Sequence, residues 1–189
     1  GTLGGRELAG AAFWAARANL ATHHPEDVVP WLQIAANDPH TLYGQLAARQ
    51  LGLGPPLEFA LPALTAAEVQ AVLGVPAVRR AIALSQIGHD TMADREMRAL
   101  YAAGGLGMAP ALLAAAGQHG MASAALRIGR ALLNFAGLDY PAALYPLAPW
   151  TPESGFNVDR ALLHAFMRQE SAFNIRALSI DGARGLMQL

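Results

Sequence analysis

The residues best suited to chemistry lie near the C-terminal end of this sequence, around a single glutamate. Glu170 ends a segment, residues 158–170, whose apolar side chains recur at helical spacing. Phe166 and Phe173 flank the glutamate, so we expect a partly buried carboxyl group, the environment in which a general acid holds its proton. Asp181 precedes Gly182 in the manner of a turn residue. Glu170 is therefore the one candidate catalytic acid, and Asn157 is the expected cap of its helix.

Small, hydroxyl and amide residues follow in two short motifs: Glu170-Ser171, then Ser179, Gly182-Ala183 and the Gly-Leu-Met-Gln run of residues 185–188. This combination resembles the start of the catalytic domain of the soluble lytic transglycosylases, lysozyme-like enzymes that cut bacterial peptidoglycan. The resemblance covers residues 168–188. The resemblance is weaker over the preceding sequence, whose general residue pattern is similar to that of the helical superhelix in the larger family members.

The resemblance implies a mechanism with one carboxylate. Glu170 would protonate the glycosidic oxygen between N-acetylmuramic acid and N-acetylglucosamine and then, as carboxylate, accept the proton of the muramoyl C6 hydroxyl. That hydroxyl attacks C1 from within the sugar and gives a 1,6-anhydro product, so the second carboxylate of ordinary glycosidases is not needed. The family further implies peptidoglycan glycan strands as substrate, a periplasmic location and no cofactor.

The resemblance also implies four substrate contacts, each with a structural alternative. Ser171 and Ser179 would lie close to the acid and the sugar, but they also suit a helix-terminal hydroxyl and a turn residue. Met187 and Gln188 would line the cleft, although a thioether at this position is also typical core filler. We predict all four as substrate-binding residues and expect no metal site, because His23, His24 and His40 lack ligand spacing and an accompanying carboxylate.

A second class of function fits the same sequence. A helical-repeat scaffold or binding protein would keep the helices and carry an inert carboxylate motif. An Ala-Tyr-Asn motif, which the family carries further along, would favour the enzyme. The sequence begins without an initiator methionine or a signal pattern and stops at Leu189 inside an apolar run, so we expect a fragment cut at both ends. No Ala-Tyr-Asn motif occurs before Leu189, so we expect an incomplete cleft and no activity of the fragment alone.

The composition excludes several classes of protein. Hydrophobic residues make up 53% of the 189 residues and charged residues 14%, so the chain is not intrinsically disordered. The formal net charge is -1 and the 13 basic residues, all arginines, are scattered, which argues against nucleic acid or an anionic membrane as partner. Glycines and a proline interrupt the uncharged stretch 102–126, so we expect no transmembrane span. Without cysteine there is no disulfide or thiolate site.

The rest of the sequence predicts short helices joined by small turns. Alanine and leucine dominate, and Thr65 followed by Glu68 forms a capping box that begins a helix at residue 66. The predicted helices are residues 6–21, one from Pro25 to 36, then 41–51, 66–73, 78–87, 92–103, 109–116, 121–135 and 158–170. We expect Phe13, Trp14, Trp31 and Tyr43 to be core residues, with a sugar-stacking surface as the alternative.

Such helices bury an apolar face only by stacking on their neighbours. We therefore predict an all-α fold: a helical superhelix or solenoid over residues 1–149, followed by the truncated start of a lysozyme-like domain over residues 150–189. The boundary is placed in a stretch rich in proline and aromatic residues, 140–152, where each residue before a proline favours extended chain. An irregular helical domain without a repeat is the alternative for residues 1–149.

Overall fold

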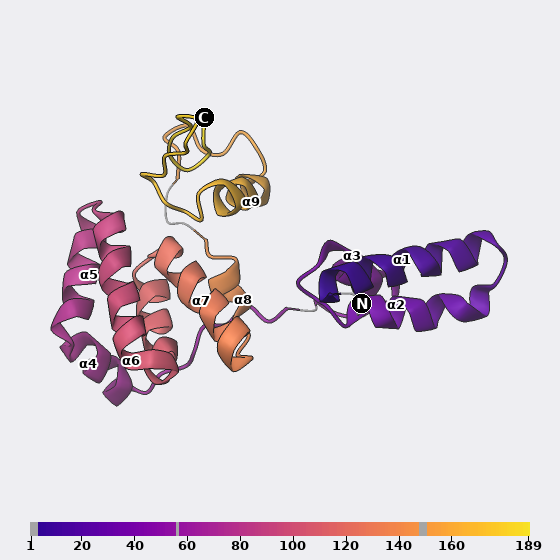
Figure 1. Cartoon of the computed structure of the whole chain (residues 1–189), viewed down its shortest axis with the longest axis horizontal. Coiled ribbons are helices and arrows are strands. Elements are labelled where there is room, and N and C mark those ends of the chain that lie inside the picture. Colours follow the sequence, from indigo (N-terminus) through magenta and orange to yellow (C-terminus); the bar gives the residue numbers. More distant parts are fainter. Residues whose placement is uncertain (1–3, 56, 148–150) are drawn as a thin grey trace. The chain divides into compact units, whose positions relative to one another are not determined.

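The computed structural model describes residues 4–55, 57–147 and 151–189, and its regular elements are helices (Figure 1). Within these ranges no strand forms, and Leu178 and Arg184 make an isolated antiparallel bridge. The prediction of an all-α chain is confirmed. The chain divides into two units, Gly1–Glu58 and Phe59–Leu189.

The first unit consists of α1 (Gly5–Ala21), the 3-10 turn η1 (Pro25–Asp27), α2 (Val28–Ala36) and α3 (Leu42–Gln50). Alanines let these helices approach closely around two larger side chains, Phe13 and Leu32. Thr41 caps α3, because its Oγ1 accepts a hydrogen bond of 3.0 Å from the Gly44 amide. Consecutive helices pack on one another, as a stacked series requires.

The aromatic residues of this unit are not all core residues. Phe13 is buried, but Trp14 is 59% exposed and Trp31 37% exposed, so the prediction was wrong for both tryptophans. The buried side of α1 is formed by Ala9, Ala12, Phe13 and Ala16. Trp14 stands about 100° around the helix from Phe13, which directs it to the edge of that face.

The second unit begins with α4 (Ala66–Gly74), α5 (Pro76–Gln86), α6 (Asp90–Gln118) and α7 (Ala122–Ala136). The predicted capping box is present. The Glu68 Oε2 accepts from the Thr65 amide at 2.8 Å and the Thr65 Oγ1 accepts from the Glu68 amide at 3.3 Å. The hydrogen bond from the Thr65 amide lowers the pKa of Glu68.

Helix α6 occupies the sequence where two helices were predicted. Gly105 has φ 60° and ψ −159°, which is not a helical conformation, and it divides α6 into two arms. A residue with a side chain adopts this backbone geometry only with strain, so glycine is required at the kink. The two predicted segments, 92–103 and 109–116, lie in the two arms.

The core of the second unit lies between α5, α6 and α7, which pack side by side (Figure 1). Its fully buried side chains include Met97, Leu112, Leu113 and Leu132. Gly129 of α7 provides the contact with the next element, since a Cβ built there would lie 2.7 Å from the Cβ of Ala143. That next element is α8 (Pro141–Leu144), a short helix in a stretch predicted to be extended. Pro141 occupies its first turn, where a proline needs no amide hydrogen.

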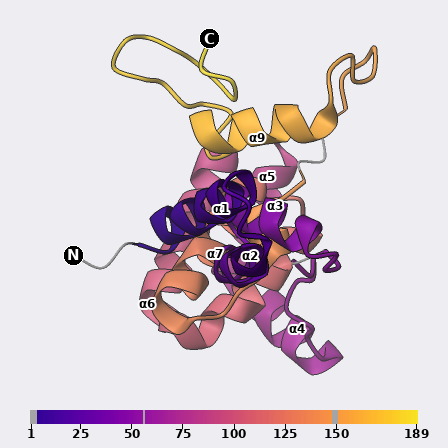
Figure 2. The same ribbon diagram turned by 90° about the vertical axis from the view of Figure 1, so that its right-hand side faces the viewer.

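Helix α9 (Arg160–Glu170) carries the predicted catalytic glutamate. It begins at Asp159, whose Oδ1 accepts from the Leu162 amide at 3.0 Å, so the cap predicted at Asn157 was wrong by two residues. Figure 2 shows the C-terminal segment leaving one end of α9 and the preceding segment leaving the other. The predicted domain boundary between residues 149 and 150 lies outside the described residues. It stays a prediction.

Candidate functional site

Glu170 lies in the last turn of α9, and its side chain is exposed. This differs from the partly buried carboxyl group that we expected between Phe166 and Phe173. Phe166 is itself 48% exposed, whereas Phe173 is 3% exposed. Residues four positions apart share one face of a helix, so Phe166 and Glu170 lie together on the exposed face of α9. The buried face carries His164 and Met167.

The chain reverses sharply directly after Glu170. The carbonyl oxygen of Met167 accepts three hydrogen bonds: from the Ser171 amide at 3.2 Å, the Ser171 hydroxyl at 3.0 Å and the Phe173 amide at 3.2 Å. Ala172 and Phe173 have left-handed backbone angles, with φ 50° and 62°. Left-handed geometry costs a non-glycine residue roughly 1–2 kcal/mol. Burial of the Phe173 ring offsets this strain. The Ser171 hydroxyl is thus a helix-terminal group.

The reversal brings the two sequence motifs together. Phe173 packs in an apolar cluster with Ala122 and Leu126 of α7 and Met167 of α9. Leu186 and Met187, from the Gly-Leu-Met-Gln run, pack against the same cluster. Met187 is therefore partly buried, with one side of its side chain packed against the cluster. The second motif consequently packs against a cluster to which the helix that carries Glu170 contributes Met167.

Ser179 holds the turn between the two motifs. Its Oγ accepts hydrogen bonds from the Ala183 amide at 3.0 Å and the Asp181 amide at 3.2 Å. Its own amide donates to the Ala183 carbonyl at 2.9 Å. A hydroxyl oxygen has two acceptor positions and one hydrogen to donate. Both acceptor positions are thus used within the turn, and the hydrogen is left to donate to a bound molecule.

A hydrogen bond within its own loop holds the side chain of Gln188. Its Nε2 donates to the Gly185 carbonyl at 2.8 Å, and its backbone φ is 51°. The amide oxygen is not part of that bond, so it can accept a hydrogen bond from a ligand. The side chain is half-buried.

Two residues of α9 to which the sequence assigned no role have defined contacts. Arg168 donates from Nε to the Leu144 carbonyl at 2.7 Å, and its guanidinium carbon lies 4.7 Å from the centroid of the Tyr145 ring. His164 is 7% exposed, and its Nδ1 lies 2.8 Å from the Arg160 carbonyl. Because a carbonyl only accepts, Nδ1 carries the hydrogen. Arg168 stands two residues before the first motif, but its partners lie 23 and 24 residues earlier, at no recognisable spacing.

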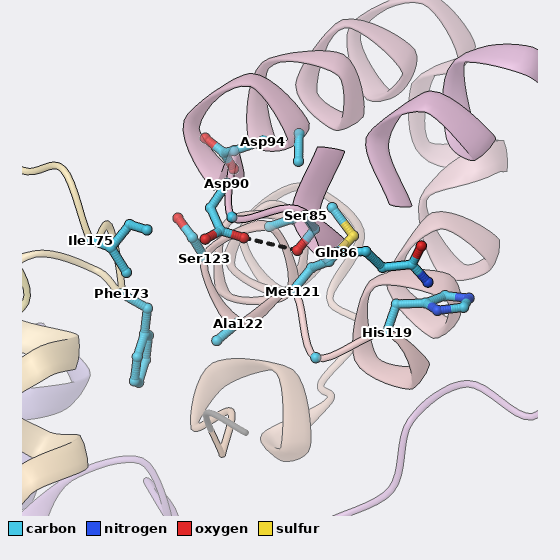
Figure 3. Close-up of a pocket in the computed structure, with 14 residues that line it drawn as sticks. Ser85, Gln86, Asp90, Asp94, His119, Met121, Ala122, Ser123, Phe173 and Ile175 are labelled. Carbon is cyan, nitrogen blue, oxygen red and sulfur yellow. Dashed lines mark hydrogen bonds between the residues drawn. The ribbon is translucent and has the colours of Figure 1, made fainter. Parts of the chain in front are cut away.

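A cavity of about 420 Å³ lies beside this segment, in the second unit (Figure 3). Phe173 and Ile175 form one wall, and Asp90, Ser123 and Ser85 are on the side of the helices. The Ser85 hydroxyl donates to Asp90 Oδ1 at 2.8 Å, drawn as a dashed line. None of the five predicted site residues lines this cavity, as far as the described residues define it.

The buried carboxylate at this cavity is Asp94, which is 7% exposed. Its Oδ2 forms ion pairs with Nε of Arg98 at 3.1 Å and of Arg127 at 3.3 Å. Burial raises the pKa of Asp94, and Arg127 and Arg98 oppose that effect by lowering it. Arg127 belongs to α7 and Arg98 to α6, so this carboxylate links the two helices.

The described residues contain no group of three or more histidine, aspartate or glutamate side chains arranged to hold a metal ion. In the same described ranges, no helix has both the length and the apolar character needed to cross a bilayer.

Comparison with known proteins finds similarity to lytic transglycosylases. Residues 151–189 match the model of the Transglycosylase SLT domain. The fold resembles that of the 70 kDa soluble lytic transglycosylase from Escherichia coli, with a TM-score of 0.74 and 21% identity, over 96% of this chain and 29% of that chain. It also resembles the lytic transglycosylase Slt from Pseudomonas aeruginosa, crystallised as an inactive mutant, with a TM-score of 0.67 and 26% identity, over 96% of this chain and 30% of that one.

The chain thus spans less than a third of the length of either solved protein. No curated protein sequence matches it. The SLT match covers the segment that carries both motifs, and the structural matches extend over nearly the whole chain. Residues 151–189 are thus similar to the Transglycosylase SLT domain, and the fold of the chain is similar to that of soluble lytic transglycosylases.

Proposed function

We propose that the protein cleaves the β-1,4 bond between N-acetylmuramic acid and N-acetylglucosamine in peptidoglycan glycan strands, and that it releases a 1,6-anhydro-muramoyl product. Peptidoglycan strands are then its partner, the periplasm is its location, and no cofactor takes part. The observation that carries the proposal is the meeting of the two motifs. Leu186 and Met187 pack against a cluster that includes Met167 of the helix whose last turn presents Glu170.

Glu170 acts twice in the proposed reaction. As the acid, it gives its proton to the glycosidic oxygen while the bond from C1 to that oxygen breaks. The C6 hydroxyl oxygen of the same muramoyl residue then bonds to C1, and its proton passes to the Glu170 carboxylate. The carboxyl group is thereby restored, and no water is consumed. An internal nucleophile has a high effective concentration, which explains how one carboxylate suffices.

The exposure of Glu170 is consistent with a group that must reach a polymeric substrate. A general acid needs a hydrogen-bond distance of about 2.6–3.2 Å to the atom that it protonates. Glu170 is exposed at the end of a helix whose opposite face is buried, so the backbone is held while the carboxyl group stays accessible. The bound glycan itself would then exclude water from the carboxyl group.

The proposed substrate contacts use the atoms that the local structure leaves available. Ser179 donates its hydroxyl hydrogen to the acetamido carbonyl, because both acceptor positions of its oxygen are already used. Gln188 accepts a sugar hydroxyl through its amide oxygen, since its amide nitrogen is bonded to Gly185. The Ser171 hydroxyl donates its hydrogen to the Met167 carbonyl, so its oxygen accepts a hydrogen bond from the glycan. The exposed part of the Met187 side chain makes an apolar contact with the glycan.

The Pseudomonas relative supports a central role for an acidic group in this family. Its structure is described as that of an inactive mutant, in which glutamine replaces glutamate. That statement concerns the relative. For this chain, the same substitution at Glu170 is the direct test.

Glu170→Gln keeps the size and hydrogen bonding of the side chain but removes proton transfer. Proton transfer by a positioned side chain contributes about 10²–10⁴-fold to a rate, and here it is used in both steps. We therefore expect the release of anhydro-muropeptides from purified sacculi to fall by at least about 10²-fold when the intact gene product carries this substitution. Chromatography with mass detection measures the product.

Glu153→Gln is the matched control, because Glu153 is an exposed glutamate in the same segment. We expect it to retain parental turnover. Turnover of Glu170→Gln within tenfold of the parent would refute the assignment. It would then favour a helical scaffold that carries an inert carboxylate.

A further inference from the structure

The last turn of α9 is attached to α8 through one side chain. Arg168 reaches from α9 to the Leu144 carbonyl with a hydrogen bond of 2.7 Å, and its guanidinium lies over the ring of Tyr145 at 4.7 Å. A charged donor makes a shorter and stronger bond to a carbonyl than a neutral donor does. The aromatic ring fixes the plane of the guanidinium at the same time. Arg168 is thus held in both distance and orientation.

The partner of Arg168 is part of a rigid base. Ala143 is 0% exposed and Leu144 is 3% exposed. Gly129 lets α8 approach α7 so closely that a methyl group at that position would collide with Ala143. Interiors packed at this density transmit strain and do not absorb it. The Leu144 carbonyl therefore moves with α7, not with the loop that follows it.

Arg168 is also close to other positive charge. Burial lowers the pKa of Arg130, and Arg168 and Arg127 lower it further through their charge. Repulsion of this kind disfavours the placement of a guanidinium here. Arg168 keeps its contacts with Leu144 and Tyr145 despite this repulsion.

Glu170 follows Arg168 by two residues in the same turn of α9. We propose that Arg168 is a positioning residue for Glu170: its bond to Leu144 and its stacking on Tyr145 fix the end of α9, and with it the carboxyl group, relative to α7 and α8. This inference rests on the proposed function, since it concerns the geometry of the acid. A misplacement of about 1 Å in a reacting group costs on the order of 10²-fold in rate.

The same helix supplies a matched control. Arg160 lies at the start of α9 and also stacks on an aromatic ring, with its guanidinium carbon 5.4 Å from the centroid of the Phe156 ring. Arg160 and Arg168 therefore share a helix, a charge and a type of contact. They differ in that Arg168 is hydrogen-bonded to α8 and adjoins Glu170. A general loss of helix stability should affect both substitutions alike.

The experiment compares Arg168→Ala, Arg168→Lys and Arg160→Ala in the intact gene product. Kinetics are measured on soluble glycan strands of defined length, with anhydro-muropeptide as the product. We expect kcat to fall at least tenfold for both Arg168 variants, with KM within twofold of the parent, because the glycan contacts lie elsewhere. Lysine should not restore kcat, since an ammonium group cannot stack in a plane while it donates along a fixed direction. Arg160→Ala should keep kcat within twofold.

Hydrogen exchange provides a readout that does not depend on activity. The amides of Ser171 and Phe173 are bonded to the Met167 carbonyl, so they report whether the end of α9 is fixed. We expect these two amides to exchange at least tenfold faster in Arg168→Ala than in Arg160→Ala, while the amides of α7 are unchanged in both variants. Unchanged α7 amides also establish that the variant is folded.

Each result decides the proposal. A kcat for Arg168→Ala within twofold of that for Arg160→Ala would overturn it, as would full restoration by lysine or a loss confined to KM. Equal exchange rates at Ser171 and Phe173 in the two alanine variants would overturn it too. If the parent releases no anhydro product, the proposed function itself fails. The exchange rates then decide by themselves whether Arg168 anchors the end of α9.

Discussion

Phe173 is the side chain that holds the C-terminal segment onto the helical core, and its truncation gives a specific test of this attachment. The ring is 3% exposed, packs with Ala122, Leu126 and Met167, and lies 6.3 Å from the His164 ring between centroids. Replacing a buried phenylalanine by alanine generally costs about 3–5 kcal/mol. Since roughly 1.4 kcal/mol corresponds to a factor of ten, the attachment should weaken by about 10²–10³-fold or more.

Backbone strain at Phe173 adds to the expected weakening of the attachment. Alanine at position 173 would retain the left-handed backbone, with φ 62°, and so keep the strain of roughly 1–2 kcal/mol without the burial that offsets it. We therefore expect the segment after Glu170 to detach locally while α5, α6 and α7 stay folded, because their core does not include Phe173. Phe173→Leu, which keeps most of the apolar volume, should weaken the attachment of the segment clearly less than Phe173→Ala does.

Hydrogen exchange and chemical denaturation measure the two parts separately. The amides of Ser179 and Gly185 are bonded within the segment, and we expect their protection to fall while that of α7 is kept. Phe166→Ala is the control, because Phe166 is 48% exposed on the same helix and its loss should cost little. Equal effects of Phe173→Ala and Phe166→Ala would refute the idea that Phe173 attaches the segment.

Two further predictions concern the helical core. Gly129→Ala should lower the free energy of unfolding by about 1–3 kcal/mol, because its Cβ would lie 2.7 Å from that of Ala143. Gly74→Ala, where a Cβ meets open space, should be neutral or stabilising. Denaturant midpoints measure both variants, and equal midpoints would contradict the close contact at Gly129. Burial raises the pKa of Asp94 above its unfolded value near 4, so the native state binds this proton more tightly. The stability of the parent relative to Asp94→Asn should therefore increase as the pH falls from 7 toward 4, and a decrease over that range, measured by denaturation at each pH, would show that the ion pairs dominate.

Local signals in the sequence predicted the helices well. The capping box at Thr65 and Glu68 set the start of α4, and glycine or proline at the ends of apolar runs marked most other boundaries. These signals work because the atoms involved are within a few residues of one another. The short helix α8 was missed for a related reason. Pro141 favours extended chain for the residue before it, yet it also suits the first turn of a helix, and the packing of Ala143 on Gly129 decides between the two.

The two motifs were sufficient to identify the candidate site, because residue types at a fixed spacing indicate chemistry without requiring their positions in space. They did not determine which side chains are buried. Phe166 and Phe173 looked equivalent beside Glu170, but one is exposed and the other is in the core. The difference arises from two left-handed residues and from three hydrogen bonds to one carbonyl, and neither is encoded at a readable spacing.

The sequence by itself thus determined the all-α class and most helix limits, and it supplied Glu170 as the candidate acid, since each depends on local backbone preference or on residue type. Only the tertiary structure decided the surroundings of that glutamate. Arg168 contacts Leu144 and Tyr145, and Met187 packs against the cluster that contains Leu126 and Met167, because separate segments pack together and not because of their separation in sequence. Contacts between distant segments depend on the free energy of the whole packed unit, and no single stretch of sequence contains that sum.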